Sequence, residues 1–522
     1  MRPEDDDPVT ELTGDAPWQR LDRRMLLVHP VREVLRFLPV LIAFVLAGNA
    51  AGGPDAPWEL VGVAIPIALG LLRYLTTSFR IAHGRVELRR GLLNRHVLST
   101  PVDRVRTVDV TASPIHRVLG LTTVRVGTGT ASTDEDDRLD LDGLPASRAR
   151  QLREDLLRAS PVDDAPATVA PGERVLVRLD PGWIRFAPFT SSGAVMAAAV
   201  IGAASQLLDS LGGVPRLDPS RVADGVAGAS PWVAVPAGLV LLGVLVALLS
   251  IAGYLVTNWG FTLSRADGSW HLRRGLLTRR ETSLDHERVS GVIIGEPLGL
   301  RVAGGARVSA IVTGLDRAQQ GSSVLVPPAP HAVAQQAARE VLGTAGPVDA
   351  PLVGHGPRAR VRRYTRALVP AVAVLAAAGV LVAVADASYW LLAVACLALP
   401  AAVALGADRV RGLGHALSDG YVVSRSGSLN RHRSALATAD VIGWNFRATW
   451  FQRRAGLTHL VATTAGGSQR VTVLDVPESV GVVLASRAVP GLVEQFRARP
   501  PTRGDVSVAA HPGADPCDAD NL

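Results

Sequence analysis

The chain of 522 residues contains no lysine and only two cysteines. Arginine therefore carries all of the basic side-chain charge, and the formal net charge is +7. Cys396 lies in an apolar run and Cys517 lies near the C-terminus, so a disulfide framework is excluded and no metal-ligand spacing is present. We expect no metal site and no cofactor.

Sequence signals for secretion and for catalysis are also lacking. The first thirty residues hold the acidic run 4–7 and no apolar core segment, so no signal peptide is expected. The histidines are scattered without a companion nucleophile, and no glycine-rich phosphate loop follows a strand. The acidic run 134–137 lacks the glycine spacing of a calcium loop. The sequence therefore predicts a protein that is not an enzyme.

Apolar and charged residues are both abundant. Hydrophobic residues make up 48% of the chain and the mean hydropathy is +0.24, yet 19% of residues are charged. This mixture indicates apolar blocks alternating with polar domains. Six apolar stretches approach the roughly 20 residues that a membrane-spanning helix needs. They form three pairs, at 34–51 and 58–77, 186–208 and 232–256, and 365–384 and 389–406. Buried helices of a soluble protein are the alternative interpretation, but paired runs this long are rare in soluble folds.

Arginines flank the first and third hairpins and are missing from the loops inside them. The loop of the second hairpin carries Arg216 and Arg221, partly offset by acidic residues. Under the positive-inside rule, this distribution predicts a multi-pass cell-membrane protein with both termini and all large polar blocks in the cytoplasm.

The three polar blocks resemble one another. Aligned stretches centre on Gly91, Gly275 and Gly427, which are spaced by 184 and 152 residues. The stretches are ELRRGLLNRH at 87–96, HLRRGLLTRR at 271–280 and VVSRSGSLNRH at 422–432. Downstream, 117–121 aligns with 453–457, and we interpret the middle copy as shorter there, at 297–300. A unit of lead-in, hairpin and polar domain has been triplicated.

Short alternating strands dominate each block, and the glycine lies where a hairpin turn favours positive φ. Strands are expected near 85–88, 97–100, 107–111 and 122–127, and closing helices at 145–159, 332–342 and 477–497. The predicted fold class is an α+β membrane protein with three repeats of a transmembrane helix hairpin plus a small β-barrel capped by a C-terminal helix. The expected divisions are a lead-in (1–33), hairpin (34–77), domain (78–160), linker and lead-in (161–185), hairpin (186–257), domain (258–345), linker (346–364), hairpin (365–407), domain (408–498) and disordered tail (499–522).

These features resemble a known family. A membrane hairpin, a strand with the pattern (L/V)-x-R-x-G-x-L-x-R, an Arg-Val pair and R-x-x-G-L are similar to the bacterial PH-like domain (bPH2) membrane proteins of the YdbS/YdbT type. The middle copy lacks the full R-x-x-G-L, and Asp440-Val441 replaces the Arg-Val pair in the third. The resemblance covers about residues 20–497. It implies pleckstrin-homology-like barrels and a membrane-associated binding or scaffold module.

Basic side chains flank each glycine turn and are the candidate contacts for anionic lipid or a protein partner. They are Arg89, Arg90, Arg95, His96, Arg273, Arg274, Arg279, Arg280, Arg425, Arg431 and Arg433. Near a membrane, each such charge contributes about 1 kcal/mol toward anionic lipid. The alternative is a solvated hairpin that only obeys the positive-inside rule.

The predicted function is non-catalytic binding or scaffolding at the inner face of the plasma membrane, in envelope stress or in resistance to membrane-active agents. A transporter or export component using the six helices is the alternative, although the apolar segments hold almost no ionisable residues. The expected partners are the phospholipid bilayer, anionic head groups and a second membrane protein of the same family. Nucleic acid is not expected, because the arginines lack aromatic interleaving.

Overall fold

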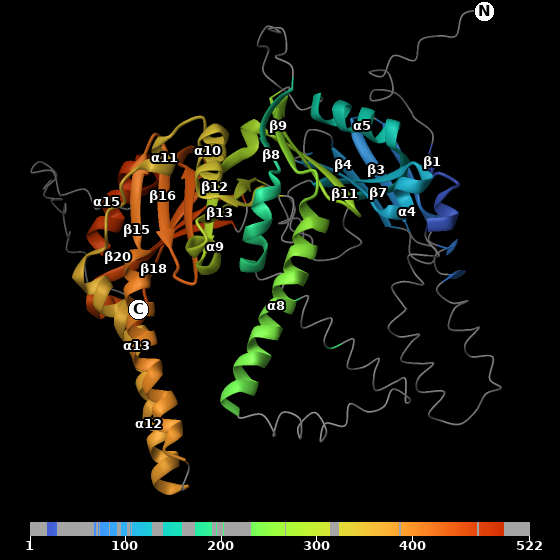
Figure 1. The fold of residues 1–522 in the computed structure, drawn as a ribbon. Coiled ribbons are helices and arrows are strands. Elements are labelled where there is room, and N and C mark those ends of the chain that lie inside the picture. Colours follow the sequence, from blue (N-terminus) through green and yellow to red (C-terminus); the bar gives the residue numbers. More distant parts are fainter. Residues whose placement is uncertain are drawn as a thin grey trace, which may run out of the picture.

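The structure is a computed structural model. It describes residues 18–28, 67–68, 71–72, 74–82, 84–90, 96–101, 105, 107–127, 139–158, 173–190, 195, 202, 231–266, 268–313, 323–385, 388–466 and 469–494. Three repeats follow one another along the chain (Figure 1). Each repeat has a first half-sheet, a second half-sheet of three strands, a short helix within that second half, and a closing helix.

The elements of repeat one are β1 (Gln19–Arg20), β2 (Ser78–Ala82), β3 (Arg85–Arg90), β4 (His96–Pro101), β5 (Thr107–Ala112), α4 (Pro114–Leu119), β6 (Leu121–Gly127), β7 (Leu139–Pro145) and α5 (Ala146–Arg158). Those of repeat two are β8 (Arg174–Arg178), η3 (Pro181–Phe189), α8 (Pro231–Asn258), β9 (Thr262–Ala266), β10 (Ser269–Arg274), β11 (Arg279–Asp285), η4 (His286–Arg288), β12 (Val289–Pro297), α9 (Leu298–Val302), β13 (Gly305–Val312), β14 (Val324–Pro330) and α10 (His331–Leu342).

The short helix α11 (Gly346–Asp349) leads into repeat three. Repeat three contains α12 (Gly356–Val384), α13 (Trp390–Arg411), β15 (Gly414–Ser418), β16 (Tyr421–Ser426), β17 (Asn430–Ala437), η6 (Thr438–Asp440), β18 (Gly443–Arg447), α14 (Trp450–Ala455), β19 (Leu457–Thr463), β20 (Arg470–Pro477), α15 (Glu478–Ala488) and α16 (Pro490–Glu494). The strands and closing helices predicted from the alternating pattern are confirmed to within a few residues.

Neighbouring repeats share continuous sheets. The second half of repeat one pairs through β5 with β11 of repeat two, which gives a seven-stranded sheet in the order β7-β6-β5-β11-β10-β9-β8. In the same way β12 of repeat two pairs with β17 of repeat three, in the order β14-β13-β12-β17-β16-β15. The outermost halves form separate sheets, β1-β2-β3-β4 and β18-β19-β20.

The expected closed barrel is therefore not found among the described residues. A barrel needs the two halves of one repeat to pair along their edges. Here β5 and β12 instead pair with strands of the following repeat, β11 and β17. In repeats one and two the two halves still pack face to face, and the closing helix covers the apolar interior. In repeat three the closing helices α15 and α16 pack on β19 and β20.

Each predicted hairpin lies, in sequence, between two segments that pair with each other. Strand β8 precedes the second hairpin in sequence and β9 follows it, yet the two strands pair directly. Strand β1 pairs with β2 across the first hairpin, and Val353 bridges to His415 across the third. The lead-in segments therefore belong structurally to the domains that follow the hairpins.

Large apolar side chains fill the core of repeat two. Trp270, Phe186 and Phe261 are fully buried there, and each contributes about 1.5–3 kcal/mol through burial. Phe186 lies in η3 rather than in a membrane helix. The predicted span 186–208 is thus wrong at its start, because Phe186 is part of the domain core. The rest of that span is outside the described residues, apart from 187–190, 195 and 202.

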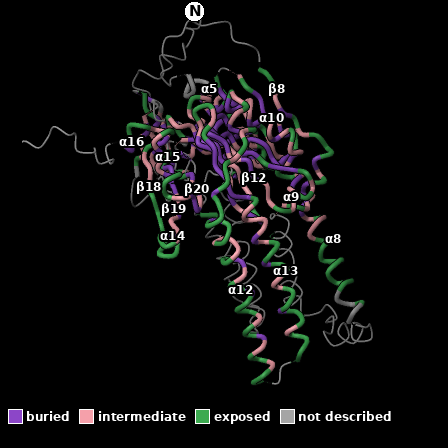
Figure 2. The backbone as a smooth tube through the Cα atoms, turned by 90° about the vertical axis from the view of Figure 1, so that its left-hand side faces the viewer, coloured by how far each residue is buried: buried purple, intermediate pink, exposed green. Residues whose placement is uncertain are grey.

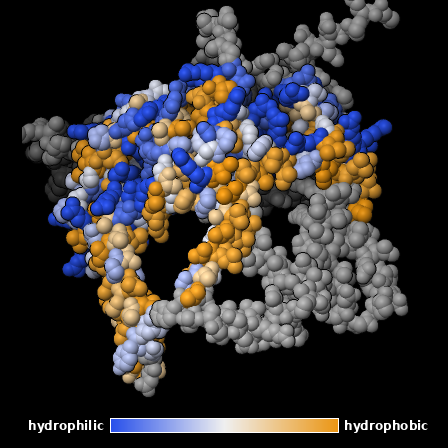
Figure 3. Space-filling view, in the orientation of Figure 1, coloured by the Kyte–Doolittle hydropathy of each residue, from blue (hydrophilic) through white to orange (hydrophobic). Residues whose placement is uncertain are grey.

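Three described helices are long and apolar enough to cross a membrane: Pro236–Asn258 within α8, together with α12 and α13. They extend from the same side of the sheets (Figures 1 and 2). Small side chains bring α12 and α13 together, since Ala367, Ala371 and Ala402 form a cluster between them. The outward faces are apolar and project below a more hydrophilic body (Figure 3). The first predicted hairpin lies outside the described residues, except for 67–68, 71–72 and 74–77.

Candidate functional site

The glycine turn of repeat two lies on the end of the apolar helix α8. The amides of Gly275 and Leu276 donate to the carbonyls of Trp259 and Val256, both at 2.9 Å. Gly275 has φ 109°, and a Cβ at this position would overlap the Thr278 carbonyl. The turn therefore requires glycine here, as the sequence predicted, and it satisfies carbonyls that the helix end leaves free.

Repeat three places its turn at the end of α13 in a related way, but with charged side chains. Arg425 Nη2 donates to the Arg411 carbonyl at 2.9 Å. Arg431 Nη2 lies 2.7 Å from Asp408 Oδ1. Cationic side chains at a helix C-terminus interact favourably with the helix dipole. Gly427 has φ 95° and confirms the predicted turn.

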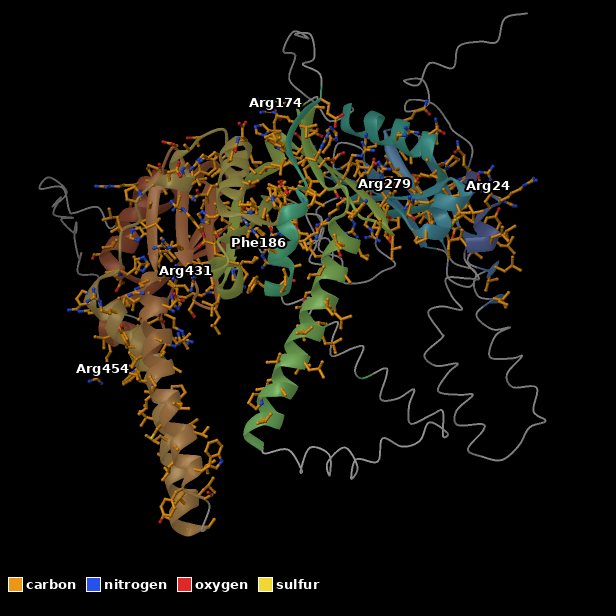
Figure 4. The ribbon with its side chains drawn as sticks, viewed as in Figure 1. Arg24, Arg174, Phe186, Arg279, Arg431 and Arg454 are labelled. Carbon is orange, nitrogen blue, oxygen red and sulfur yellow. The ribbon has the colours of Figure 1, made fainter. Side chains whose placement is uncertain are left out.

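Apolar side chains project from the described parts of this membrane-facing side. Leu276, Leu277 and Leu429 are exposed at the turns, and Trp450 and Phe451 are exposed on α14. We name these five residues the membrane-proximal rim. Trp450 and Phe451 contact each other edge to face, and Arg454 lies over the Trp450 ring. Arg454 is beside the upper end of the α12–α13 hairpin (Figure 4). Aromatic rings and arginine at such a level are typical of a membrane interface.

The candidate residues of repeat one are only partly described. The Arg89 guanidinium lies 4.2 Å from the centre of the Trp18 ring, an interaction that the sequence did not indicate. Arg90 lies in β3 and His96 begins β4. The side chains of those two residues, and Arg95 as a whole, fall outside the described part.

In repeat two, one acidic side chain draws several candidates together. Glu281 Oε1 lies 3.1 Å from Arg273 Nε and 3.3 Å from Arg279 Nε. Arg274 and Arg280 oppose each other across β10 and β11. Burial, followed by the neighbouring Arg280, lowers the pKa of Arg274. Arg273 and Arg279 remain about half exposed.

In repeat three, the candidates have intramolecular roles. Arg433 donates to the carbonyls of Pro347 and Ala350 at 3.0 and 2.8 Å, and thereby fastens the linker to β17. Burial lowers the pKa of Arg433, and it also lowers that of Arg431, which lies near Arg301. Arg425 and Arg431 contact the end of α13, so all three arginines have partners within the domain.

A groove of about 950 Å³ runs between repeats one and two. Helix α5 forms one wall, and the outward faces of β10 and β11 form another (Figure 4, beside Arg279). Its charged lining consists of the side chains of Arg117, Arg150, Arg153, Arg273, Arg279, Glu173 and Glu281. Five arginines against two glutamates leave a net charge of +3. We name this feature the junction groove.

The sequence alignment missed the equivalence of Arg301 with Arg117. Gly120 and Gly456 cap α4 and α14, and Gly304 follows the Ala303 cap of α9; all three glycines have positive φ. The structure thus aligns Arg301 with Arg117, and the middle copy is not shorter as expected. Arg453 occupies the same place in repeat three. In repeat two, Gly305 stands where the other two repeats have a leucine after the motif glycine. The glycine three residues after each arginine is the sequence signal that could have revealed this alignment.

A buried carboxylate also escaped the sequence analysis. Asp475 is fully buried, and Arg362 Nε and Arg363 Nη2 of α12 lie 3.0 and 2.8 Å from its oxygens. Gln452 Nε2 donates to Oδ1 at 2.7 Å. These contacts fix the start of α12 to β20. Among the residues that the structure describes, no cluster of three or more potential metal ligands occurs.

A family model for the bacterial PH domain matches the chain three times, at residues 33–160, 207–343 and 367–483. These matches cover well over half of the sequence. The chain belongs to the bacterial PH domain family. The three matched segments correspond to the three structural repeats, and each takes in hairpin residues as well as domain residues. Comparisons with curated proteins and with solved structures give no significant match.

Proposed function

We propose that this bacterial PH domain protein is a non-catalytic, multi-pass scaffold that binds anionic lipid head groups at the inner face of the cell membrane. One observation carries the proposal: the turn of repeat two caps the C-terminus of α8 and exposes Leu276 and Leu277 beside an arginine-rich groove. This contact holds the domain against the membrane surface. Exposed leucines there enter the interfacial layer, while neighbouring arginines meet phosphate groups.

The junction groove is the proposed head-group site. Arg279 follows the turn, so the groove begins at the level where lipid phosphates lie. Guanidinium groups bind phosphate in a bidentate fork, which favours arginine over a simple point charge. Glu281 holds Arg273 and Arg279 at the edge of the junction groove. A bound phosphate competes with Glu281 for these two side chains.

Lipid retention by the full chain tests the proposal. The protein is reconstituted in nanodiscs of phosphatidylcholine and phosphatidylglycerol, and lipids kept after detergent exchange are counted by native mass spectrometry. Arg273→Gln with Arg279→Gln should reduce phosphatidylglycerol retention by about fivefold per arginine, from about 1 kcal/mol per charge. The control is Arg174→Gln, because Arg174 is exposed, does not line the groove and lies at the top of the body, away from the apolar helices (Figure 4). Equal retention by all variants would overturn head-group binding.

A second variant separates head-group binding from a purely structural role. Glu281→Gln removes the carboxylate that competes for Arg273 and Arg279 while keeping its size. The proposal expects greater phosphatidylglycerol retention by this variant at low salt. Unchanged or weaker retention would assign the arginines to fold stability alone.

The proposed orientation places both termini and all three repeats in the cytoplasm. A reporter fused after Leu522 should be active on the cytoplasmic side, and one inserted near Pro54 should be external. The reverse pattern would contradict the orientation.

The cellular role we propose is in envelope stress or resistance to membrane-active agents, since a scaffold on anionic lipid stands where such agents act. A deletion strain should therefore become more sensitive to cationic membrane-disrupting peptides. Unchanged sensitivity would reject this role without bearing on lipid binding.

A further inference from the structure

The two ends of the repeat array present sheet edges with no paired strand in the described part of the chain. At one end β4 pairs with β3 alone, and at the other β18 pairs with β19 alone. In Figure 1, β4 lies in the half of the body formed by repeat one, and β18 lies in the half formed by repeat three. An exposed strand edge carries free backbone donors and acceptors and is a template for another strand.

Inside the chain, the equivalents of these edges pair with each other twice. Strand β5 of repeat one joins β11 of repeat two, and β12 of repeat two joins β17 of repeat three. By the repeat spacing, β18 corresponds to β5 and β12, while β4 corresponds to β11 and β17. Each internal junction therefore pairs a strand equivalent to β18 with a strand equivalent to β4.

Both internal junctions use the same register. Val110 stands opposite Glu281 in the first, and Ile294 stands opposite Arg433 in the second. These are equivalent pairs, because they are offset by the spacings of 184 and 152 residues that separate the repeats. The same offsets place Phe446 of β18 opposite Val97 of β4.

The exposure of the side chains at this position indicates that each free edge lacks a neighbouring strand. Val110 and Ile294 are 7% and 4% exposed within their junctions, whereas Phe446 is 40% exposed. Val97 is 51% exposed. The internal junctions pair an apolar side chain with a charged one here, but Phe446 and Val97 are both apolar and suit a directly opposed cross-strand pair.

An arginine contact repeats with the strand pairing. Arg117 Nη1 donates to the Leu276 carbonyl at 2.8 Å, and Arg301 Nη1 donates to the Ser428 carbonyl at 3.3 Å. Each arginine reaches from the short helix of one repeat to the glycine turn of the next. The corresponding residue of repeat three is Arg453, which is exposed at the free end.

We propose that β18 of one chain pairs with β4 of a second copy of this chain, so that the repeats continue from molecule to molecule. The contact joins two different surfaces, and such head-to-tail association gives rings when the rotation closes and filaments when it does not. The described membrane helices leave from one side of the sheets (Figure 1). A contact that repeats the internal junctions keeps the hairpins of the second copy on that side, in the same membrane. This association does not depend on head-group binding.

Disulfide cross-linking in native membranes tests the register. In a background with Cys396→Ser and Cys517→Ser, one chain carries Phe446→Cys and a co-expressed chain carries Val97→Cys. Directly opposed residues lie about 4.5–5.5 Å apart between Cα atoms, within the range of a disulfide. With equal expression and random mixing, mild oxidation should convert up to about half of each chain into a covalent dimer, and a chain with both substitutions should give a ladder of higher species.

Matched controls fix the interpretation. Asn445→Cys should cross-link poorly with Val97→Cys, because a one-residue shift turns the side chain to the other face of the sheet. Either single variant alone should give no dimer, since the contact is not self-complementary. Val110→Cys with Glu281→Cys, detected by peptide mapping, checks that the oxidant reaches the same register inside one chain. Efficient internal linking with no dimer would overturn the proposal, as would equal linking by Asn445→Cys.

Charge substitutions provide a second test that does not rely on cysteine. Phe446→Arg should abolish oligomers of the detergent-solubilised full chain in analytical ultracentrifugation, whereas Phe446→Leu should keep them. Combining Phe446→Arg chains with Val97→Glu chains should restore association, because opposite charges then face each other across the strands. A wild-type chain that is monomeric in membranes and detergent, with its edges covered by its own tail or by a different protein, would contradict the proposal.

Discussion

In repeat two, the end of α8 meets the domain through uncharged groups. Backbone amides of the turn donate to its last carbonyls, and the Tyr254 hydroxyl donates to the Pro328 carbonyl at 2.9 Å. In repeat three, charged side chains make the corresponding contacts. Asp475 holds Arg362 and Arg363 at the start of α12, and Asp408 holds Arg431 at the end of α13.

This difference shows that equivalent repeats reach the same geometry by different chemistry. Backbone hydrogen bonds respond little to pH, but a buried charged group becomes costly as soon as its partner is lost. Repeat three should therefore be the more sensitive to charge substitutions and to acid.

Asp475→Asn should have the largest effect. The substitution keeps the shape and suits the positive φ of 52° at this residue. It leaves Arg362 and Arg363, each 13% exposed, without their counter-charge. We expect a loss of about 3–5 kcal/mol in the free energy of unfolding of repeat three, measured by denaturant unfolding in detergent micelles. Asp349→Asn, which breaks an exposed pair with Arg339, is the control and should change stability by less than about 1 kcal/mol. Equal effects of the two variants would contradict the account.

Acid should weaken repeat three next. Burial, together with the neighbouring His415, lowers the pKa of His355 to about 4. His355 Nε2 lies 2.9 Å from His415 Nδ1, and Asp475 and Arg363 also act on it. The unfolded chain takes up a proton below about pH 6.5, where the folded chain resists it. Stability should thus be full above about pH 6.5 and fall as the pH drops toward 4. Proteolysis of repeat three across this range measures the effect, and His355→Gln should flatten the profile.

Tyr254→Phe should cost repeat two about 1 kcal/mol, because it removes one partly buried hydrogen bond, to the Pro328 carbonyl. The melting temperature of the full chain reports this loss. Tyr421→Phe is the matched control, since the Tyr421 hydroxyl makes a longer contact of 3.4 Å with the Leu342 carbonyl. A larger loss from Tyr421→Phe would show that the hydroxyl of Tyr254 does not fix α8.

The smallest effect should have the opposite pH dependence. A hydrogen bond from His331 Nε2 to Glu296, at 2.7 Å, raises the pKa of His331 in repeat two. This contribution is present below about pH 6.5 and is lost as the pH rises through the raised value. His331 is partly exposed, so the change should stay below about 1 kcal/mol. Hydrogen exchange of β12 at pH 6 and pH 8.5 measures it, and His331→Gln should remove the difference.

The sequence predicted the local elements well, because they depend on nearby residues. The alternation of apolar and polar residues predicted the strands. The need for positive φ predicted the turns at Gly275 and Gly427. The same reasoning could not reveal that β5 pairs with β11, since strand partners far apart in sequence are chosen by edge complementarity rather than by local pattern. Likewise, the residues near β8 do not indicate that its partner strand, β9, follows the predicted hairpin in sequence.

The candidate site was predicted only in part. The arginines around the turns do gather near helix ends, but their partners decide what they do. Arg433 was predicted to contact lipid or a partner, and the sequence did not indicate that its Nε and Nη2 donate to the Pro347 and Ala350 carbonyls. Arg117 and Arg153, which also line the junction groove, come from other elements. From the sequence, Arg117 stood out only as part of the R-x-x-G-L pattern, and Arg153 did not stand out.

Membrane depth is the most direct test of the claim that the rim holds the repeats at the bilayer surface. Spin labels at Leu277→Cys and Arg174→Cys, in the Cys396→Ser and Cys517→Ser background, are compared by power saturation in nanodiscs. The account predicts that the label at 277 is accessible to oxygen and shielded from a water-soluble nickel complex, while the label at 174 shows the reverse. Equal exposure of both labels to the nickel complex would contradict it.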